Sequence, residues 1–306
     1  MIIQRKYWRL AMDTYDITFV GHMCYDEIIP YNSPARIAPG SAVLCGAVVA
    51  AKTGKKVAAV VKMAKQDESI LEPMKQAGVE TFLIPSEHTT YSRVIHPVED
   101  VDVRKLVIVR NAGYFFIDEI PELNTGFVHL AGISDQEFTL DFIYGLKRKG
   151  YKLSADMQSF VRQVDPETGE IEFKDVLQKM EIIKELSMVK LDIVEAKVLT
   201  NTDDIEKAAG AIEAWGCPEI VITHSGGVLA RVNGNTYYEK FSNSSVVGRT
   251  GRGDTTFAAY LSWRMDHDPR EALKFAAALV SIKMESPGPF AGTVNDVLVR
   301  INEKHR

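Results

Sequence analysis

The sequence predicts an α/β protein whose mostly parallel, doubly wound sheet is flanked by helices. From Ile17 onward, short apolar runs alternate with segments of helical period, which is the pattern of a parallel sheet wrapped by helices. Between Glu80 and Phe116 this rhythm gives way to alternating strands, which predicts a small antiparallel excursion. A chain of 306 residues can bury roughly three quarters of its surface, so the core needs no metal or disulfide.

The strands and helices can be placed along the chain from apolar period, caps and turn residues. We expect strands at 17–20, 57–61, 93–98, 105–110, 127–130, 152–155, 188–191 and 219–223, and a hairpin over 228–241 that turns at Asn233-Gly234. We expect helices from the cap Ser41 to Gly54, from the cap Asp67 to Gly78 with a late start at Pro73, and at 135–149, 173–186, 203–215, 254–265 and 269–283. The last two helices are expected to close the chain.

Charge and composition exclude several classes of protein. Lys and Arg number 36 against 41 Asp and Glu, so the net charge of -5 offers no electrostatic footprint for nucleic acid. The longest apolar run, 42–51, is too short to cross a membrane. Cys24, Cys45 and Cys217 have neither disulfide nor metal-ligand spacing and are expected to be reduced thiols, so we expect a cytoplasmic protein. Residues 1–15 lack a signal-peptide pattern and are expected to form a loose extension, with Met12 an alternative start.

The most informative segment is the glycine loop at 248–254, GRTGRGD, which leads directly into a helix. Its glycines let the backbone approach a ligand, and the helix N-terminus adds positive potential, so the segment suits an anion. Asp254 is suited to remove a proton from a hydroxyl group that attacks a phosphoryl group. Gly-x-Gly-Asp arises by chance in roughly one such chain in ten, and Asp254 could instead be an N-cap.

Other motifs agree with this one in order along the chain. The loop resembles the C-terminal signature of the ribokinase-like (PfkB) carbohydrate kinases, Asp-Thr-x-Gly-Ala-Gly-Asp, in which Gly251, Gly253 and Asp254 match. Upstream matches are Gly21 with Asp26, the block Gly40 to Gly54, Asp67 with Gly78, Asp156 with Gln158 and Arg162, the Asp192-x-x-Glu195 pair, and the loop Thr223 to Gly226. The resemblance extends from about residue 16 to residue 292.

This resemblance implies a fold, an activity and a set of roles. It implies a ribokinase-like kinase domain over 16–306, with lid segments near 26–38 and 90–112, that transfers phosphate from ATP to a hydroxyl group of a small sugar, polyol or nucleoside. Asp254 would be the general base beside an anion hole of Gly251, Arg252 and Gly253. Acceptor hydroxyls would lie at Asp26, Gly40, Ser41 and Cys45, nucleotide at Thr223, Ser225, Gly226 and Arg249, and Mg²⁺, largely through water, at Asp192 and Glu195. Homodimerisation through the lid is left open.

Several positions depart from the family pattern. Ser41 replaces the second Gly of a Gly-Gly pair and Cys45 replaces an Asn, so ribose is not assumed as the substrate. Arg249 and Arg252 stand where the family has Thr and Ala; they could bind a triphosphate or face solvent. Gly248 stands where the family has an Asp that helps to bind an activating monovalent cation, so that site should be weak or absent.

Two other classes of protein remain open at this point. A catalytically weak, kinase-like binding or regulatory protein would explain the altered Asn and Gly positions. A nicotinamide oxidoreductase would need Gly-x-Gly-x-x-Gly after the first strand, where the chain has Gly21 alone. Single residues keep alternatives too, because Asp192 and Glu195 could form a solvated helix face and Asp26 could be a turn residue before Pro30.

Overall fold

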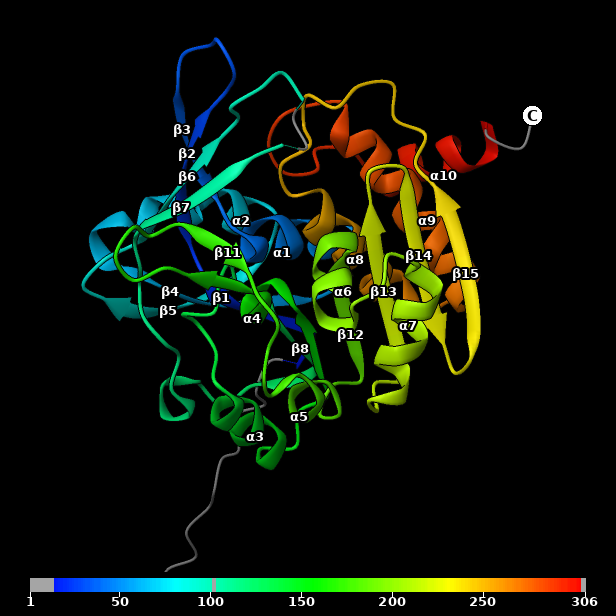
Figure 1. The fold of residues 1–306 in the computed structure, drawn as a ribbon, viewed down its shortest axis with the longest axis horizontal. Helices are drawn as coiled ribbons and strands as arrows, with labels where there is room; N and C mark the ends of the chain where they lie inside the picture. Colours follow the sequence, from blue (N-terminus) through cyan, green and yellow to red (C-terminus); the bar gives the residue numbers. More distant parts are fainter. Residues whose placement is uncertain (1–13, 101–102, 304–306) are drawn as a thin grey trace, which may run out of the picture.

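A computed structural model describes residues 14–100 and 103–303. Its centre is a nine-stranded sheet in the order β15-β14-β13-β12-β9-β8-β1-β4-β5 (Figure 1). Seven of these strands are parallel, and β14 and β15 add an antiparallel edge. The strands are β1 Thr14–His22, β4 Val57–Ala64, β5 Glu80–Ser86, β8 Asn124–Leu130, β9 Leu153–Asp156, β12 Met188–Asp192, β13 Glu219–His224, β14 Gly227–Val232 and β15 Asn235–Lys240.

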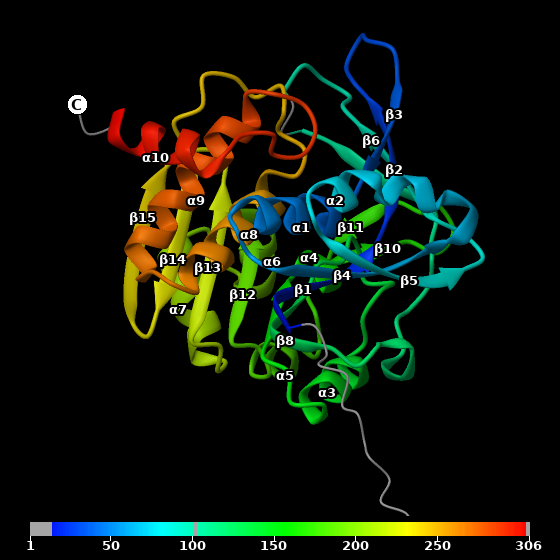
Figure 2. The ribbon, with the colours of Figure 1, turned by 180° about the vertical axis from the view of Figure 1, so that it is seen from behind.

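Helices cover both faces of this sheet, and each face has its own apolar core. One face packs against α1 Ala42–Lys52, α2 Glu72–Gln76, α8 Arg252–Arg264, α9 Pro269–Met284 and α10 Val294–Glu303 (Figure 2). The other face packs against α3 Leu140–Arg148, α4 Gln158–Val161, α5 Lys179–Ile183, α6 Ile193–Thr200 and α7 Ile205–Ala214. The doubly wound α/β fold predicted from the sequence is therefore confirmed.

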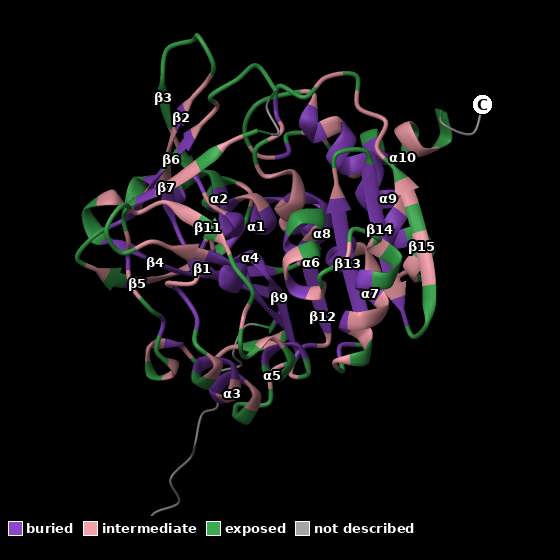
Figure 3. Ribbon diagram, in the orientation of Figure 1, coloured by how far each residue is buried: buried purple, intermediate pink, exposed green. Residues whose placement is uncertain are grey.

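A second, four-stranded sheet stands beside the carboxyl ends of the parallel strands. Its order is β3-β2-β6-β7, with β2 Cys24–Ile29, β3 Arg36–Gly40, β6 Thr90–Ile95 and β7 Lys105–Arg110. Its strands carry many exposed and intermediate residues, whereas the central strands of the large sheet are mostly buried (Figure 3). A short hairpin of β10 Arg162–Val164 and β11 Ile171–Phe173 contacts β7, where the N–H of Ile108 donates to the carbonyl of Gly169 at 2.7 Å.

Several predicted elements have the wrong type or bounds. The helix expected over 173–186 is wrong at its start, because Phe173 pairs with Arg162 in the β10–β11 hairpin and only α5 is helical. The helix expected from residue 135 begins at Leu140, where Thr139 provides the cap. Asp67 caps no helix, because it lies inside the 3-10 helix η1 Lys65–Leu71, and α2 begins late, as Pro73 required.

The ends of the chain also differ from the expectation. A further helix, α10, follows α9, so the prediction that two helices close the chain is wrong. Strand β1 begins at Thr14, so Thr14 and Tyr15 belong to the sheet, and the rest of the expected extension, 1–13, lies outside the described residues. In the described ranges, no helix is both long and apolar enough to cross a membrane.

Candidate active site

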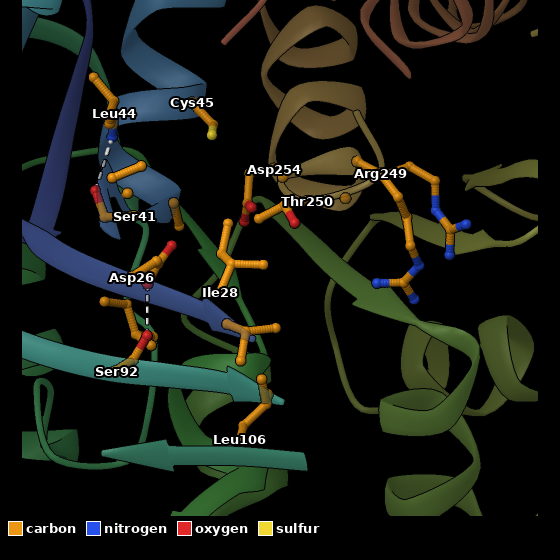
Figure 4. A pocket seen from close by; sticks show the side chains of 18 of the residues that line it. Asp26, Ile28, Ser41, Leu44, Cys45, Ser92, Leu106, Arg249, Thr250 and Asp254 are labelled. Carbon is orange, nitrogen blue, oxygen red and sulfur yellow. Dashed lines mark hydrogen bonds between the residues drawn. The ribbon is translucent and has the colours of Figure 1, made fainter. Parts of the chain in front are cut away.

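A pocket of about 400 Å³ lies where the small sheet faces the carboxyl ends of the parallel strands. Crevices at this edge are where ligands of doubly wound sheets bind. Of the residues singled out from the sequence, the pocket lining includes Asp26, Gly40, Ser41, Cys45, Asp192, Thr223, Arg249, Gly251, Arg252, Gly253 and Asp254. Side chains from the small sheet, α1 and the N-terminus of α8 point into the same space (Figure 4). Residues up to 228 positions apart, Asp26 and Asp254, thus share one site.

The glycine loop is shaped by two close approaches. Gly251 has φ +79 and forms the N-cap of α8, and a Cβ atom there would lie 2.7 Å from the Sγ atom of Cys45. A Cβ atom at Gly253 would lie 3.0 Å from the Nζ atom of Lys190. The first N–H groups of a helix have no acceptor inside it, and the helix dipole adds positive potential there. This end of the pocket therefore suits an anion, although the N–H of Arg252 donates to Arg249 O within the loop at 3.0 Å.

Asp254 is the third residue of α8 and lines the pocket beside that loop. The side-chain amide of Gln158 donates to its Oδ1 atom at 3.4 Å, a long contact that orients the carboxylate across the sheet edge. Gln158 is itself fixed, because its amide also donates to the carbonyl of Gly132 at 2.7 Å. A carboxylate at this point can accept a proton from a hydroxyl group that lies between it and the small sheet.

At the small-sheet end, Asp26 is a buried carboxylate held by neutral donors. Ser92 donates a hydrogen bond to its Oδ1 atom at 2.6 Å, and the thiol of Cys24 donates to the same atom at 3.3 Å. Burial raises the pKa of Asp26 above its ordinary value. Its Oδ2 atom lies against Gly40, where a Cβ atom would be only 2.0 Å away, so a side chain at position 40 would displace the carboxylate. Asp26 lies inside strand β2 and is no turn residue.

Ser41 and Cys45, the two positions that depart from the family pattern at this end of the pocket, have defined local roles. Ser41 is the N-cap of α1, and its hydroxyl accepts the N–H of Leu44 at 3.1 Å. Its φ of +137 is a conformation that favours glycine, which explains why this position of the family carries one. Cys45 lies one turn further along α1, and burial raises the pKa of its thiol to about 12. Its sulfur is therefore a neutral packing group against Gly251.

The opposite end of the pocket contains a buried lysine that sequence reasoning missed. Lys190, on β12, is 2% exposed, and its ammonium contacts Asp156 at 2.9 Å and Glu195 at 3.8 Å. Burial lowers the pKa of Lys190, but the carboxylates of Asp156 and Glu195 outweigh that effect and raise it above its ordinary value. The lysine is therefore a fixed positive charge beside Gly253. The signal was a single Lys inside the apolar strand 188–191.

Arginines extend this positive charge along the pocket. Arg162 stacks over the ring of Phe173 at 5.8 Å and donates to Glu195 at 3.0 Å, and its Nε atom is buried with no hydrogen-bond partner among the described residues. Arg104, on the segment before β7, was not singled out from the sequence. Burial, followed by repulsion from Arg162 and Arg249, lowers the pKa of Arg104 to about 9. Such crowding of cations is relieved when a polyanion binds between them.

The two residues predicted to hold Mg²⁺ are only partly suited to it. Asp192 caps α6, and its Oδ1 atom accepts the N–H groups of Val194 and Glu195 at 2.9 Å. Glu195 is fully buried, accepts the N–H of Asp192 at 2.7 Å and pairs with Arg162, so its oxygens are already in use. Asp192 lines the pocket and Glu195 does not. The donor set therefore fits a hydrated Mg²⁺ through Asp192 alone.

The predicted nucleotide loop is only partly at the pocket. Thr223 is the next-to-last residue of β13 and lines the pocket, but Ser225 and Gly226 are not among the lining residues. The loop closes on its own hairpin, because the N–H of Gly226 donates to the ring of His224 at 3.1 Å. That ring stacks on Tyr238 at 5.7 Å and shares a 3.1 Å hydrogen bond with its hydroxyl group.

Together these features form a pocket at the edge of a doubly wound sheet whose lining suits an anion beside a carboxylate, and comparisons with known proteins give the class of protein. The model of the pfkB family of carbohydrate kinases matches residues 10–294. A pyrophosphate-dependent kinase of the ribokinase family, solved as a sulfate complex, is 33% identical, with 92% of this chain and 99% of that one covered and a TM-score of 0.85.

Two further relatives differ in the small molecule that is named for them. A pyrophosphate-dependent kinase of the ribokinase family, solved with a pyrophosphate analogue and myo-inositol, is 31% identical, with 92% and 99% of the two chains covered and a TM-score of 0.84. A cytidine kinase of Thermococcus kodakarensis is 24% identical over 258 residues, which are 81% of this chain and 87% of that protein.

The chain belongs to the pfkB family of carbohydrate kinases. It is an enzyme that transfers phosphate to a small molecule, as the family and its relatives do for sugars, polyols or nucleosides. The oxidoreductase alternative and the alternative of a regulatory protein are therefore set aside.

Proposed function

We propose that this enzyme transfers a phosphoryl group from pyrophosphate to a hydroxyl group of a small polyol, with a cyclitol as the leading acceptor class. The observation that carries the proposal is the charge of the pocket lining. Six described cationic side chains and three carboxylates line the pocket, and Arg162 and Lys190 are also paired with Glu195 and Asp156 behind the lining. The cations are Arg36, Arg104, Arg162, Lys190, Arg249 and Arg252, and the carboxylates are Asp26, Asp192 and Asp254. A pocket with this excess, in a chain of net charge -5, is suited to a compact polyanion.

The choice of pyrophosphate over a nucleotide rests on where the cations lie. Lys190 lies beside Gly253 at the start of α8, and Arg104 and Arg162 line the same pocket, so we place both phosphates of a pyrophosphate there. The Thr223 to Gly226 loop, which would contact a nucleoside, is instead closed on the His224–Tyr238 pair. Pyrophosphate-dependent kinases at 31% and 33% identity support the same choice.

ATP, the donor that the family resemblance implies, is the second candidate. Thr223 lines the pocket, as expected of the first residue of a nucleotide loop. With either donor, Mg²⁺ would be held through Asp192 and would neutralise charge on the donor phosphates. The residues of the chain itself perform the remaining steps.

The acceptor end supports a polyol. The Asp26 carboxylate accepts hydroxyl groups, whereas Ile28, Val94 and Leu106 present aliphatic surface to the C–H edges of a ring. The small sheet that carries these side chains is, in this proposal, the lid over the acceptor. Myo-inositol is bound by the 31% identical relative.

In the proposed reaction, Asp254 accepts the proton of an acceptor hydroxyl as its oxygen forms a bond to phosphorus. The bond from that phosphorus to the bridging oxygen breaks, and orthophosphate leaves with the electron pair. The N–H groups at the start of α8, with Gly251 and Gly253 allowing close approach, stabilise the oxygens of the transferred group. Lys190 and Arg162 neutralise the leaving phosphate.

The test is a product assay with donor and acceptor varied independently. Purified enzyme with Mg²⁺ is given pyrophosphate or ATP, together with myo-inositol, ribose or cytidine, and the phosphorylated acceptor is quantified by mass spectrometry. We expect kcat/KM for pyrophosphate with a cyclitol to exceed that for ATP by at least about tenfold, a difference of about 1.4 kcal/mol. Faster turnover with ATP would overturn the donor assignment, and transfer to cytidine alone would overturn the acceptor class.

A further inference from the structure

A buried lysine on α9 makes contact with the glycine loop from behind. Lys283 is 1% exposed, and its Nζ atom donates hydrogen bonds to the backbone carbonyls of Gly248 and Thr250. The reaction described above does not use this side chain. Carbonyl oxygens only accept hydrogen bonds. Two carbonyl oxygens that are directed at one buried ammonium group therefore resemble the ligands of a small bound cation.

The loop leaves no room for an acidic residue at this point. A Cβ atom at Gly248 would lie 1.9 Å from the carbonyl oxygen of Ser286 and 2.7 Å from that of Lys283. The N–H of Gly248 also donates to Met284 at 2.8 Å, which ties the loop to the end of α9. The position where the family has an Asp is therefore closed against the helix, and the ammonium group of Lys283 occupies the space beside it.

These two hydrogen bonds act on the anion site through peptide geometry. The described residues contain no cis peptide bond, so the N–H of Gly251 points away from the carbonyl of Thr250. When Lys283 holds that carbonyl, the Gly251 N–H is turned away from α9, toward the side of the loop that lines the pocket. Lys283 also places its ammonium group behind the N-terminus of α8, and a Cβ atom at Gly251 would lie 3.9 Å from its Nζ atom.

We propose that Lys283 is a tethered cation that orients the anion hole, in place of a dissociable monovalent ion. It is a positioning residue, because it acts through the Thr250–Gly251 peptide and touches neither donor nor acceptor. This inference rests on the phosphotransfer proposed above. It assigns the charge behind the loop to Lys283, whereas Arg249 and Arg252 are among the residues that line the pocket.

The test removes the tethered charge and offers a free one. Turnover of wild type, Lys283→Met and Lys283→Gln is measured in choline, potassium and ammonium chloride at one ionic strength, with the donor that the wild type uses. Lys274→Met, on the same helix and lining only a separate small pocket, is the matched control. The variants are first compared with the wild type by circular dichroism and thermal unfolding.

We expect wild type and Lys274→Met to change less than about twofold among the three salts, because a covalently held charge needs no added ion. Lys283→Met should lose about 10² to 10³ in kcat in choline chloride, the range for loss of one oxyanion-hole donor, and ammonium or potassium should restore it saturably. Lys283→Gln keeps a hydrogen-bond donor that is one bond shorter and uncharged, so it should fold and still respond to the cations.

A second measurement does not depend on turnover. The affinity of each variant for imidodiphosphate, a pyrophosphate analogue that resists hydrolysis, is measured by titration calorimetry. We expect affinity to fall by about tenfold in Lys283→Gln, because the hydrogen bond from the Gly251 N–H to the anion is weakened. Ammonium should restore the affinity. Strong potassium activation of the wild type, or a folded Lys283 variant whose loss no cation restores, would overturn the inference. Absence of turnover in the wild type with every donor would instead contradict the proposed function and leave the calorimetric test intact.

Discussion

The two ends of the pocket, the proposed acceptor end and the proposed donor end, differ in how their charges are balanced. At the acceptor end, the single buried carboxylate of Asp26 is held by the neutral donors Ser92 and Cys24. At the donor end, Arg104 lies near Arg162 and Arg249, and repulsion from these two cations is, after burial, the next cause of the lowered pKa of Arg104. The first arrangement recognises hydroxyl groups, whereas the second gains most when a polyanion arrives.

In the proposed reaction, this difference places the acceptor and the donor at opposite ends of the pocket. Asp254 and the N-terminus of α8 lie between the two ends, so a hydroxyl group held at Asp26 and a phosphate held at Arg162 would meet there. Each end can be tested separately, because loss of an interaction with one substrate changes the KM for that substrate. Loss of the Asp254 carboxylate, which lies between the two ends, should instead change kcat.

The largest effect is expected where the two ends meet. Asp254→Asn should fold normally but lose about 10² to 10⁴ in kcat, because a positioned general base contributes that much. The amide keeps the shape of the side chain and can still contact Gln158. Steady-state kinetics with saturating donor and acceptor check this, and a kcat within a few-fold of the wild type would remove Asp254 from the mechanism.

Loss of one arginine should weaken donor binding. Arg104→Ala should raise the KM for the phosphoryl donor by about 10- to 100-fold, as loss of a charged hydrogen bond of about 1.5 to 3 kcal/mol predicts, with little change in the KM for the acceptor. Arg110→Ala is the matched control, because Arg110 lies at the other end of β7 over the ring of Tyr91. Equal changes in both KM values would show that Arg104 supports the small sheet and does not bind the donor.

How far sequence alone reaches also differs between the two ends. The acceptor residues and the glycine loop belong to motifs, so Asp26, Gly40 and Asp254 were found by their order along the chain. Lys190 and Lys283 lie singly in apolar segments, where the only signal is a charge flanked by buried positions. Arg104 lies in a charged turn, and only the packing of the small sheet against β10–β11 brings it to Arg162.

The errors in the fold have the same physical origin. Phe173 was assigned to a helix by local pattern, but pairing with Arg162 places it in a strand, so a tertiary contact outweighs local propensity. Helix α10 has only the short amphipathic stretch after Thr293 as a signal. By contrast, the Asn233-Gly234 turn was confirmed because its positive φ values are intrinsic to those two residues.

At the acceptor end, Asp26→Asn should raise the KM for the acceptor by roughly 10- to 100-fold, since a charge-assisted hydrogen bond to hydroxyl groups contributes about 1.5 to 3 kcal/mol. The KM for the donor should change less than about twofold. Glu27→Gln is the control, because the neighbouring Glu27 pairs with Arg93 and does not line the pocket. If both KM values rise together, Asp26 has a structural role.

The smallest effect is expected in the stability of the same variant, and its sign depends on pH. Burial raises the pKa of Asp26 in the folded protein above that in the unfolded chain, about 3.9, so the folded state binds this proton more tightly. The contribution of Asp26 to stability is therefore fully present below that value and is lost as pH rises through the folded pKa. Asp26→Asn carries no titrating group there, and its Oδ1 atom can still accept from Ser92 and Cys24.

Urea unfolding between pH 4 and pH 8 should thus show the variant gaining stability relative to wild type as pH rises, then levelling off. A difference that stays constant, or that moves the other way, would mean that the buried carboxylate is stabilised by its surroundings, and the contrast between the two ends of the pocket would lose its acceptor half.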